Sequence, residues 1–427
     1  MDIKELNEII FDPIVCVKCG YCKSTCPTYL ATRDERFSPR GRLSLSYKII
    51  KEKERMGFSD LIRVFHDIDT CSKCGECEKT CPMGLNPYLS FMRAKAKTLP
   101  GKFEVISAKL TTKSKLFFTL LFYFGSKIKK SSYKINLTKI SFRQREKIEN
   151  EEKSDTIFFP SCFGYTIFSQ TKKKVESLME DLGVKFKTAP QSFSCCGAPL
   201  LFSGSMEDFE KNKKELIRKI EEKSTNDLST LLVLGPTCTY IMKKFYKELN
   251  EKFPKVKIKE ASDFIIEKIR EKEVKIHVGE KDSVGEKDGN VKNITTKRES
   301  NINPEENKKN EEENKKKSEI IVIHKPCHEK YSDAIDKKNF FKELGFNVEE
   351  TEFPCCGFGG SMFFKYPKMS NQLLDLLSEK IKEEEDKKVL VISNSPGCIL
   401  QISRKHETKH ILDLIYERII VANHQQK

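Results

Sequence analysis

Short apolar runs alternate with amphipathic stretches over the last two thirds of the chain. The runs in "DTIFFPSC", "TLLVLG", "EIIVIHKPC" and "VLVIS" have the length and the β-branched or aromatic content of buried strands. Shorter strands are expected at "VKFK" and "FNVEE", each after an amphipathic stretch that ends in Leu-Gly, a signal for the end of a helix. Strands that alternate with helices predict a parallel sheet covered by helices, and hence an α/β fold.

This pattern occurs twice. The stretch "MEDLGVKFKTAPQSFSCCG" parallels "FKELGFNVEETEFPCCG", and "IKEASDFI" parallels "TKHILDLI". The second copy follows the first after about 160 residues, well above the roughly 20–50 residues of solenoid repeats. We therefore expect two duplicated α/β domains.

Two cysteine motifs precede the duplicated part. They read "CVKCGYCKSTCP" and "CSKCGECEKTCP", and both have the C-x2-C-x2-C-x3-C-P spacing of bacterial ferredoxins. Three cysteines of such a motif wrap around one cluster, whereas the fourth lies beyond a turn and binds the other cluster. The sequence therefore predicts two [4Fe-4S] clusters, one held by Cys16, Cys19, Cys22 and Cys81 and the other by Cys71, Cys74, Cys77 and Cys26.

Zinc is the alternative occupant of these eight thiols. Zinc sites usually pair two C-x-x-C knuckles that lie a dozen or more residues apart. Four cysteines within eleven residues, followed by proline and present twice, fit zinc poorly. The spacing favours iron–sulfur clusters.

The segment between the two motifs is expected to be helical. Pro39 is suited to the first turn of a helix, and the apolar positions after it recur at helical spacing. This long insertion is similar to the helical ferredoxin type of respiratory iron–sulfur subunits. Arg40 and Arg42 either lie near the clusters, where they favour the more negative reduced state, or belong to a solvent-facing helix start.

The remaining eight cysteines are distributed equally between the two copies. In each copy the last cysteine follows the Cys-Cys pair by 42 residues. We expect these thiols at the carboxyl ends of parallel strands, where open α/β sheets build their sites. Two adjacent thiolates suit different irons of one cluster, and the alternatives are a vicinal disulfide or inert buried thiols. The predicted metal ligands are Cys162, Cys195, Cys196 and Cys238 in the first copy and Cys327, Cys355, Cys356 and Cys398 in the second.

Five segments are expected along the chain. They are a helical 4Fe-4S ferredoxin-type domain (1–100), a basic and apolar connector (101–153), a first cysteine-rich CCG domain (154–270), a charged flexible linker (271–318) and a second cysteine-rich CCG domain (319–427). The fold class is thus α/β, with an α-helical ferredoxin-type domain at the N-terminus. The linker is rich in Lys, Glu and Asn and has few large apolar residues, which is typical of a loosely ordered connection.

Charge and composition narrow the range of partners. The formal net charge is +15, but Lys and Glu are mixed along most of the chain, which favours a solvated surface over a nucleic-acid site. The first residues, "MDIKELNEIIFDP", lack the basic and apolar regions of a signal peptide, so we expect a cytoplasmic protein. Clustered cysteines in that compartment are more often metal ligands than disulfides.

One apolar stretch, 116–124, lies in the connector between lysines. It is far shorter than the roughly 20 residues that a membrane-spanning helix needs. Residues 113–130 therefore suit peripheral contact with the inner face of a membrane or docking on a partner subunit. Packing inside the protein is the remaining alternative.

The whole chain resembles a known family. The paired Cys-Cys-Gly domains resemble the cysteine-rich domains of heterodisulfide reductase. The order of the motifs, with "SPRGRLSL" and "SPGCILQI", is similar to the glycolate oxidase iron–sulfur subunit and to the iron–sulfur subunits of anaerobic glycerol-3-phosphate dehydrogenase and heterodisulfide reductase that have the same domain order. Heterodisulfide reductase domains end in C-P-x-C; Gly235 and Ser395 replace the earlier cysteine of that pattern here, which leaves four cysteines in each copy. His328 is either a substitute ligand or an ordinary polar loop residue.

The resemblance implies an electron-transfer subunit. An FAD-containing dehydrogenase subunit would oxidise glycolate, lactate or glycerol 3-phosphate, and this chain would pass the electrons to a quinone or membrane carrier. The sequence carries no flavin or nicotinamide motif, so we expect no residue of this chain to be catalytic in substrate oxidation. Besides the two [4Fe-4S] clusters, one or two further clusters are expected in the duplicated domains. The alternative is an enzyme similar to heterodisulfide reductase that cleaves a disulfide at such a cluster.

Overall fold

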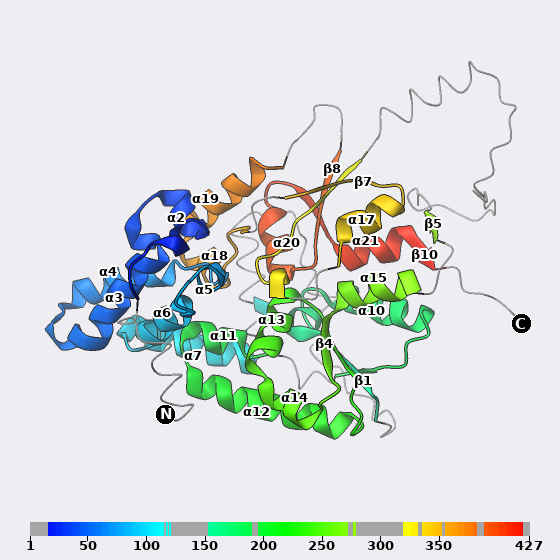
Figure 1. The fold of residues 1–427 in the computed structure, drawn as a ribbon, viewed down its shortest axis with the longest axis horizontal. Helices are drawn as coiled ribbons and strands as arrows, with labels where there is room; N and C mark the ends of the chain where they lie inside the picture. Colours follow the sequence, from blue (N-terminus) through cyan, green and yellow to red (C-terminus); the bar gives the residue numbers. More distant parts are fainter. Residues whose placement is uncertain are drawn as a thin grey trace, which may run out of the picture.

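The fold is that of a computed structural model, which describes residues 16–114, 117, 119–120, 153–189, 195–271, 276–278, 319–331, 335–351, 355–381 and 388–421. Within them the chain forms a helical unit and two α/β units (Figure 1). Most of the apolar stretch 116–124 and most of the linker 271–318 lie outside the described residues.

The helical unit consists of short and medium helices. The α-helices are α2 (Pro27–Thr32), α3 (Pro39–Glu52), α4 (Phe58–Asp69), α5 (Glu76–Lys79), α6 (Pro87–Ala96) and α7 (Leu99–Lys113), and the 3-10 helices are η2 (Tyr21–Lys23), η3 (Glu35–Phe37) and η4 (Lys53–Arg55). Pro39 begins α3, as expected, because its fixed φ suits the first helical turn and its missing N–H is not needed there. Buried residues of α6, such as Tyr88 and Met92, pack against α3, α4 and α7.

The first α/β unit contains a four-stranded parallel sheet in the order β2-β1-β3-β4. Its strands are β1 (Thr156–Phe159), β2 (Lys187–Thr188), β3 (Thr230–Val233) and β4 (Lys257–Glu260). Its helices are α9 (Ser161–Gly164), α10 (Ser169–Asp181), α11 (Ala198–Ser203), α12 (Met206–Lys223), α13 (Pro236–Phe245), α14 (Lys247–Lys252) and α15 (Ala261–Glu271). The strand expected at "VKFK" is only partly right, since β2 pairs from Lys187 onward.

The second α/β unit repeats this arrangement. Its parallel sheet has the order β7-β6-β8-β9, with strands β6 (Ile320–Ile323), β7 (Asn347–Glu350), β8 (Val389–Ser393) and β9 (Glu407–His410). Its helices are η7 (Glu329–Tyr331), α17 (Lys337–Glu343), α18 (Met362–Lys365), α19 (Pro367–Ser378), α20 (Pro396–Ile402) and α21 (Ile411–Arg418). The identical strand order confirms the duplication and the predicted fold class.

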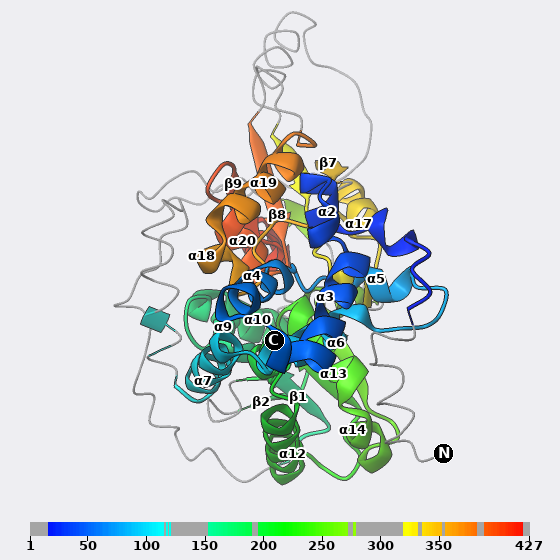
Figure 2. The same cartoon turned by 90° about the vertical axis from the view of Figure 1, so that its left-hand side faces the viewer.

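The three units are packed together. The two α/β units share one hydrophobic core, in which Leu178 and Ile265 of the first unit lie with Phe341 and Leu414 of the second. A second core joins α6 of the helical unit to α11 and α13 of the first unit. The helical unit, blue and cyan, lies to the left of both α/β units in Figure 1 and in front of them in Figure 2.

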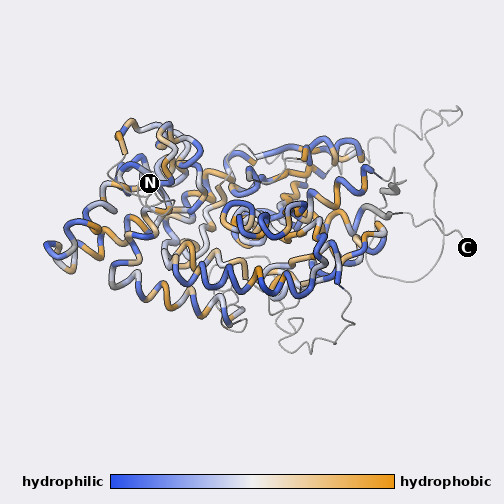
Figure 3. The backbone as a smooth tube through the Cα atoms, turned by 60° about the horizontal axis from the view of Figure 1, so that its bottom comes forward, coloured by the Kyte–Doolittle hydropathy of each residue, from blue (hydrophilic) through white to orange (hydrophobic). Residues whose placement is uncertain are grey.

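A short antiparallel pair, β5 (Ile276–Val278) with β10 (Ile419–Val421), joins the segments that follow α15 and α21. Hydrophobic and hydrophilic positions alternate along the helices that cover the sheets (Figure 3). No described helix combines the length and the apolar composition that crossing a bilayer requires.

Candidate metal centres

One group of thiols lies on the surface of the helical unit. Cys16, Cys19, Cys22 and Cys81 line a single pocket, together with Arg40. Gly20 takes a positive φ of 86° at the start of η2, which lets the chain turn between the second and third cysteines. The structure thus brings together the four cysteines that the sequence assigns to one cluster.

The second group is buried in the same unit. Cys71, Cys74 and Cys77 surround the start of α5, and Cys26 lies at the start of α2. Burial raises the pKa of the Cys77 thiol well above its usual range, and the neighbouring Cys74, Cys71 and Cys26 act in the same direction. Cys26 is therefore within electrostatic reach of Cys77 and Cys74, as the predicted crossed ligand set would require.

Arg40 and Arg42 have different surroundings. The Arg40 side chain lines the first pocket and donates to Glu35 Oε1 at 2.8 Å and to the Lys18 carbonyl at 3.2 Å. Arg42 is 1 % exposed and donates to the carbonyls of Phe37 and Asp67. Arg40 is therefore the arginine beside the first group of thiols, whereas Arg42 ties α3 to two neighbouring segments.

The four cysteines of the first α/β unit form one connected group. The thiols interact with one another in pairs, Cys162 with Cys195, Cys195 with Cys196 and Cys196 with Cys238. Their positions follow β1, β2 and β3 in chain order, at the carboxyl ends of the strands. The Tyr246 hydroxyl donates to the Cys196 carbonyl at 2.9 Å and so holds the Cys-Cys loop in place.

The Cys-Cys-Gly turn needs glycine in both copies. Gly197 and Gly357 have φ values of 84° and 82°. A Cβ atom on Gly357 would lie 2.4 Å from the Ser370 carbonyl oxygen, and one on Gly197 would lie 2.8 Å from the Phe209 ring. Backbone amides reach the thiols at these turns, since the N–H of Gly197 donates to Cys195 Sγ at 3.3 Å and that of Phe358 to Cys356 Sγ at 3.5 Å.

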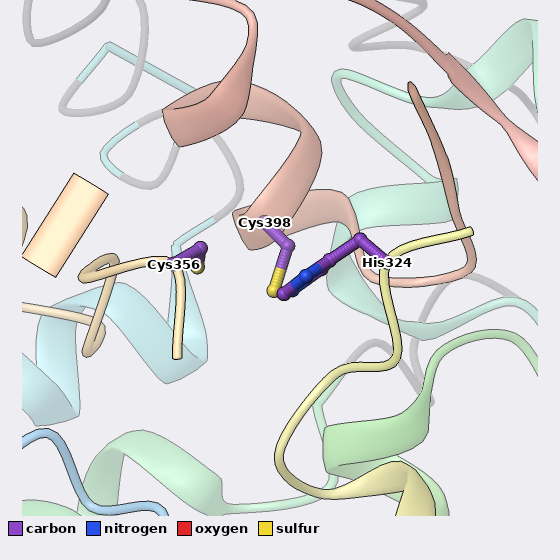
Figure 4. Close-up of side chains that lie close together, drawn as sticks. All are labelled: His324, Cys356 and Cys398. Atoms are coloured by element: carbon purple, nitrogen blue, oxygen red, sulfur yellow. The ribbon is translucent and has the colours of Figure 1, made fainter. Parts of the chain in front are cut away.

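The thiols of the second α/β unit are arranged differently. Cys356 and Cys398 lie close to each other, and His324 joins them, with one ring nitrogen and the two sulfurs all within 4.8 Å of one another (Figure 4). The interaction with Cys356 holds the pKa of the Cys398 thiol well below its usual range. Cys327 and Cys355 interact electrostatically with each other and with Cys398.

This second group lies against the helical unit. Burial raises the pKa of the Cys355 thiol, and the next contribution comes from Cys74, a residue of the buried ferredoxin-type group. Lys330 forms an ion pair with Glu76, and His328 Nε2 lies 2.9 Å from the Lys73 carbonyl oxygen. Burial lowers the pKa of Lys330 to about 8. Thiols of two units therefore approach each other across this contact.

The contacts of His328 are those of a structural residue and not of a substitute metal ligand. It is 5 % exposed, its Nδ1 lies 3.0 Å from the Thr237 hydroxyl, and its ring stacks on Tyr240 with centroids 4.8 Å apart. Both ring nitrogens are thus engaged by the two neighbouring units. The interpretation of His328 as a polar residue of the loop agrees with these contacts.

The chemistry of the four thiol groups fits metal clusters. All sixteen cysteines are free, so the structure contains no vicinal disulfide at either Cys-Cys pair. Several thiolates of like charge would be costly in one buried site, and burial indeed raises the pKa of Cys74 to about 12. A cationic group that binds several thiolates at once removes this cost. Soft thiolate ligands of this kind suit iron–sulfur clusters.

Comparison with known proteins agrees with this chemistry. The family model described as 4Fe-4S dicluster domain matches residues 14–85, and the one described as cysteine-rich domain matches residues 156–243 and 321–403. The glycolate oxidase iron-sulfur subunit of Escherichia coli is 20% identical over 426 residues, which cover 95% of this chain and 93% of the relative. The chain therefore belongs to the iron–sulfur proteins that combine a 4Fe-4S dicluster domain with two cysteine-rich domains. Another relative, lactate utilization protein A 1 of Bacillus anthracis, is 26% identical over 264 residues, which cover 59% of this chain and 92% of the relative.

Sequence reasoning missed one residue of these groups. His324 directly follows β6 and is 1 % exposed, yet it is not among the predicted ligands. The available signal is its place at the carboxyl end of a strand, three residues before Cys327. A buried histidine in the core gives the same local pattern, so only the distances to the thiols distinguish the two.

Proposed function

We propose that this protein is the iron–sulfur electron-transfer subunit of a flavoprotein dehydrogenase complex. The partner subunit, which contains FAD, would oxidise glycolate, lactate or glycerol 3-phosphate, and this chain would pass the electrons to a quinone or another membrane carrier. The observation that carries the proposal is the contact between the helical unit and the second α/β unit, where Cys74 lies within electrostatic reach of Cys355 and Cys327. Redox groups held on either side of this contact would exchange electrons within one molecule.

Two relatives support the substrate class. The name of one refers to glycolate oxidase and that of the other to lactate utilization, and both substrates are small 2-hydroxy acids. The first of these relatives is matched over nearly its whole length. We therefore favour a 2-hydroxy acid over glycerol 3-phosphate as the substrate of the complex.

We propose two [4Fe-4S] clusters in the helical unit and one cluster in each α/β unit. Such clusters accept and release single electrons, which a flavin can supply one at a time. The residues of this chain would bind the irons through sixteen thiols, exclude water by burial and direct backbone N–H groups at the sulfurs. The Lys73 N–H, 3.4 Å from Cys71 Sγ, is one such donor, and donors of this kind raise the reduction potential.

The test starts with native protein that is isolated without oxygen. We expect an FAD protein to co-purify, and glycolate or lactate to reduce the clusters within the turnover time of the complex, as followed by EPR. The Cys74→Ser variant should retain the co-purifying flavoprotein but lose most of the electron flow to a quinone analogue. No flavoprotein and no reduction by any of the three substrates, with a new EPR signal on addition of a disulfide, would replace the proposal with a disulfide reductase.

A further inference from the structure

His324 lies where a metal ligand of the second α/β unit is expected. It follows the last residue of β6, and its backbone N–H donates to the Ile392 carbonyl of β8 at 2.9 Å. Cys356 comes from the loop after β7, and Cys398 lies on α20 after β8. Three neighbouring strands thus direct an imidazole and two thiols into one space, with the Cys398 sulfur at the end of the ring (Figure 4).

The two ring nitrogens of His324 have different surroundings. Nδ1 lies 3.3 Å from the Thr351 hydroxyl, which fixes the orientation of the ring. Nε2 is buried, has no nitrogen or oxygen partner among the described residues, and lies beside the Cys398 thiol, with which the imidazole interacts. A buried polar atom without a partner costs free energy, on the order of 1–3 kcal/mol, so such atoms are rare unless a ligand satisfies them.

The other buried histidines with described contacts differ in this respect. His328 has the Thr237 hydroxyl at one ring nitrogen and the Lys73 carbonyl at the other. In His410, Nε2 lies 3.2 Å from the Asn394 carbonyl oxygen and Nδ1 accepts from the Leu412 N–H at 3.2 Å. Nε2 of His324 faces thiols and lacks such an oxygen or nitrogen partner among the described residues, which distinguishes His324 from histidines with a structural role.

The first α/β unit lacks an equivalent of this imidazole. Phe159 and Ile323 are the last paired residues of β1 and β6, so Pro160 occupies the position that corresponds to His324. In that unit the four thiols interact with one another and with backbone and hydroxyl groups, and no imidazole of the described residues is among their partners. The two copies thus share their sheet but differ in their donor atoms.

We propose that His324 is a metal ligand of the second α/β unit. Its Nε2 would donate a lone pair to iron beside Cys356 and Cys398, while the Nδ1–H would donate a hydrogen bond to the Thr351 hydroxyl oxygen. The identity of the metal as iron rests on the proposed function, whereas the ligation itself rests on the geometry. Because a neutral imidazole is then among its ligands, the group of the second unit would have a higher reduction potential than a group held by the same number of ligands that are all thiolates.

The experiment uses the full-length protein, isolated without oxygen, with and without [15N]histidine. Pulsed EPR on the protein poised at graded potentials should show a nitrogen hyperfine coupling on one cluster, and its pattern should change with the 15N label. The coupling should be lost in His324→Cys, together with a lower midpoint potential for that cluster. His406→Gln is the matched control, because His406 lies in the same unit with Nε2 2.9 Å from the Ser378 hydroxyl. It should keep both the coupling and the potential.

The labelled wild-type protein makes the test independent of whether a variant folds. If its clusters are all present and none couples to a histidine nitrogen, the ligation is refuted, even where substrate still reduces the clusters. Retention of the coupling in His324→Cys would refute it as well. Metal analysis could instead find zinc in this unit, with a nitrogen ligand that X-ray absorption detects in the wild type and not in His324→Cys. That result would support metal binding by His324 and would refute the iron–sulfur cluster that the proposed function assigns to this unit.

Discussion

Asp263 and Lys337 form a buried ion pair of 2.5 Å between the two α/β units. Burial raises the pKa of Asp263 to about 7, since the attraction of Lys337 is opposed by the carboxylates of Glu260 and Glu329. Lys337 is shared with Glu329, and Asp263 Oδ2 has no hydrogen-bond partner in the described part of the chain. One lysine thus serves several carboxylates, and the buried Asp263 gains a proton more easily than an exposed aspartate does.

This arrangement predicts a pH-dependent stability. An unfolded aspartate has a pKa of about 3.9, so between about pH 4 and pH 7 the folded protein holds a proton that the unfolded chain has lost. Stability from this group is therefore lost as the pH rises towards 7. We expect the stability of the wild type relative to Asp263→Asn to fall between pH 5 and pH 7, by up to about 1.4 kcal/mol per pH unit. Thermal unfolding at graded pH measures this, and a constant difference would contradict it.

The control for that series is Asp227→Asn. The Asp227 side chain is 82% exposed and belongs to the same unit. Its replacement should leave the pH dependence of the melting temperature as it is in the wild type.

The turn glycine of the second unit gives another prediction at this scale. Gly357→Ala places a Cβ 2.4 Å from the Ser370 carbonyl at a positive φ, whereas Gly345→Ala, at φ 84°, meets no atom within 4 Å. Both variants carry the backbone strain of the left-handed region, about 1–2 kcal/mol. We expect Gly357→Ala to be less stable than Gly345→Ala by at least about 1 kcal/mol and to lose iron from the second unit. Equal melting temperatures and equal iron contents would refute this.

At the scale of single elements, α7 exposes an apolar stripe. Phe103, Ile106 and Leu110 lie three and four residues apart on one face and are 64%, 54% and 48% exposed. Lysines at 102, 109 and 113 accompany them, and the helix leads towards the apolar stretch that the sequence marks for peripheral contact. An apolar face with basic neighbours suits the surface of an anionic membrane.

We expect changing these three residues to serine to weaken binding to vesicles that contain anionic lipid by about tenfold or more, since each loses apolar contact area. Co-sedimentation with vesicles of phosphatidylglycerol and phosphatidylethanolamine measures the effect. Tyr416→Ser, at an exposed residue of α21, should bind as the wild type does. If the wild type itself stays in solution at low salt, α7 is not a membrane contact.

The helices and strands also show which structural features could be predicted from the local sequence. The parallel sheets, the helix that begins at Pro39 and the grouping of the thiols follow from periodicity, turn residues and the spacing of cysteines, whereas the order of the strands in each sheet was not predicted. The start of β2 did not follow, because pairing with β1, and not strand propensity, decides which residues join the sheet. His324 did not follow either, because a ligand and a core histidine differ only in what surrounds the ring.

At the scale of the whole molecule, the contact between the helical unit and the second α/β unit was beyond sequence reasoning. It depends on pairs that are about 250 residues apart, such as Lys330 with Glu76 and His328 with the Lys73 carbonyl. Nothing in the local pattern marks these residues as partners. Their burial arises only when both units are folded and packed.

The ion pair at this contact can be tested by charge reversal. Lys330→Glu places a second carboxylate beside Glu76 at a site where both side chains are about four-fifths buried. We expect a loss of about 3 kcal/mol in stability and a slower electron flow to the quinone analogue. The double variant Glu76→Lys/Lys330→Glu should recover a large part of both, as measured in a double-mutant cycle. Additive effects of the two changes would show that the pair does not couple the units.

The shared core of the α/β units and the pairing of β5 with β10 determine whether the protein must be a single polypeptide. Both contacts join the chain before residue 279 to the chain after residue 318, without help from the peptide bonds in between. A single backbone cut between those positions would therefore yield two polypeptides that remain associated as one particle. The same architecture can then be made from two separate genes, one for the helical unit with the first α/β unit and one for the second.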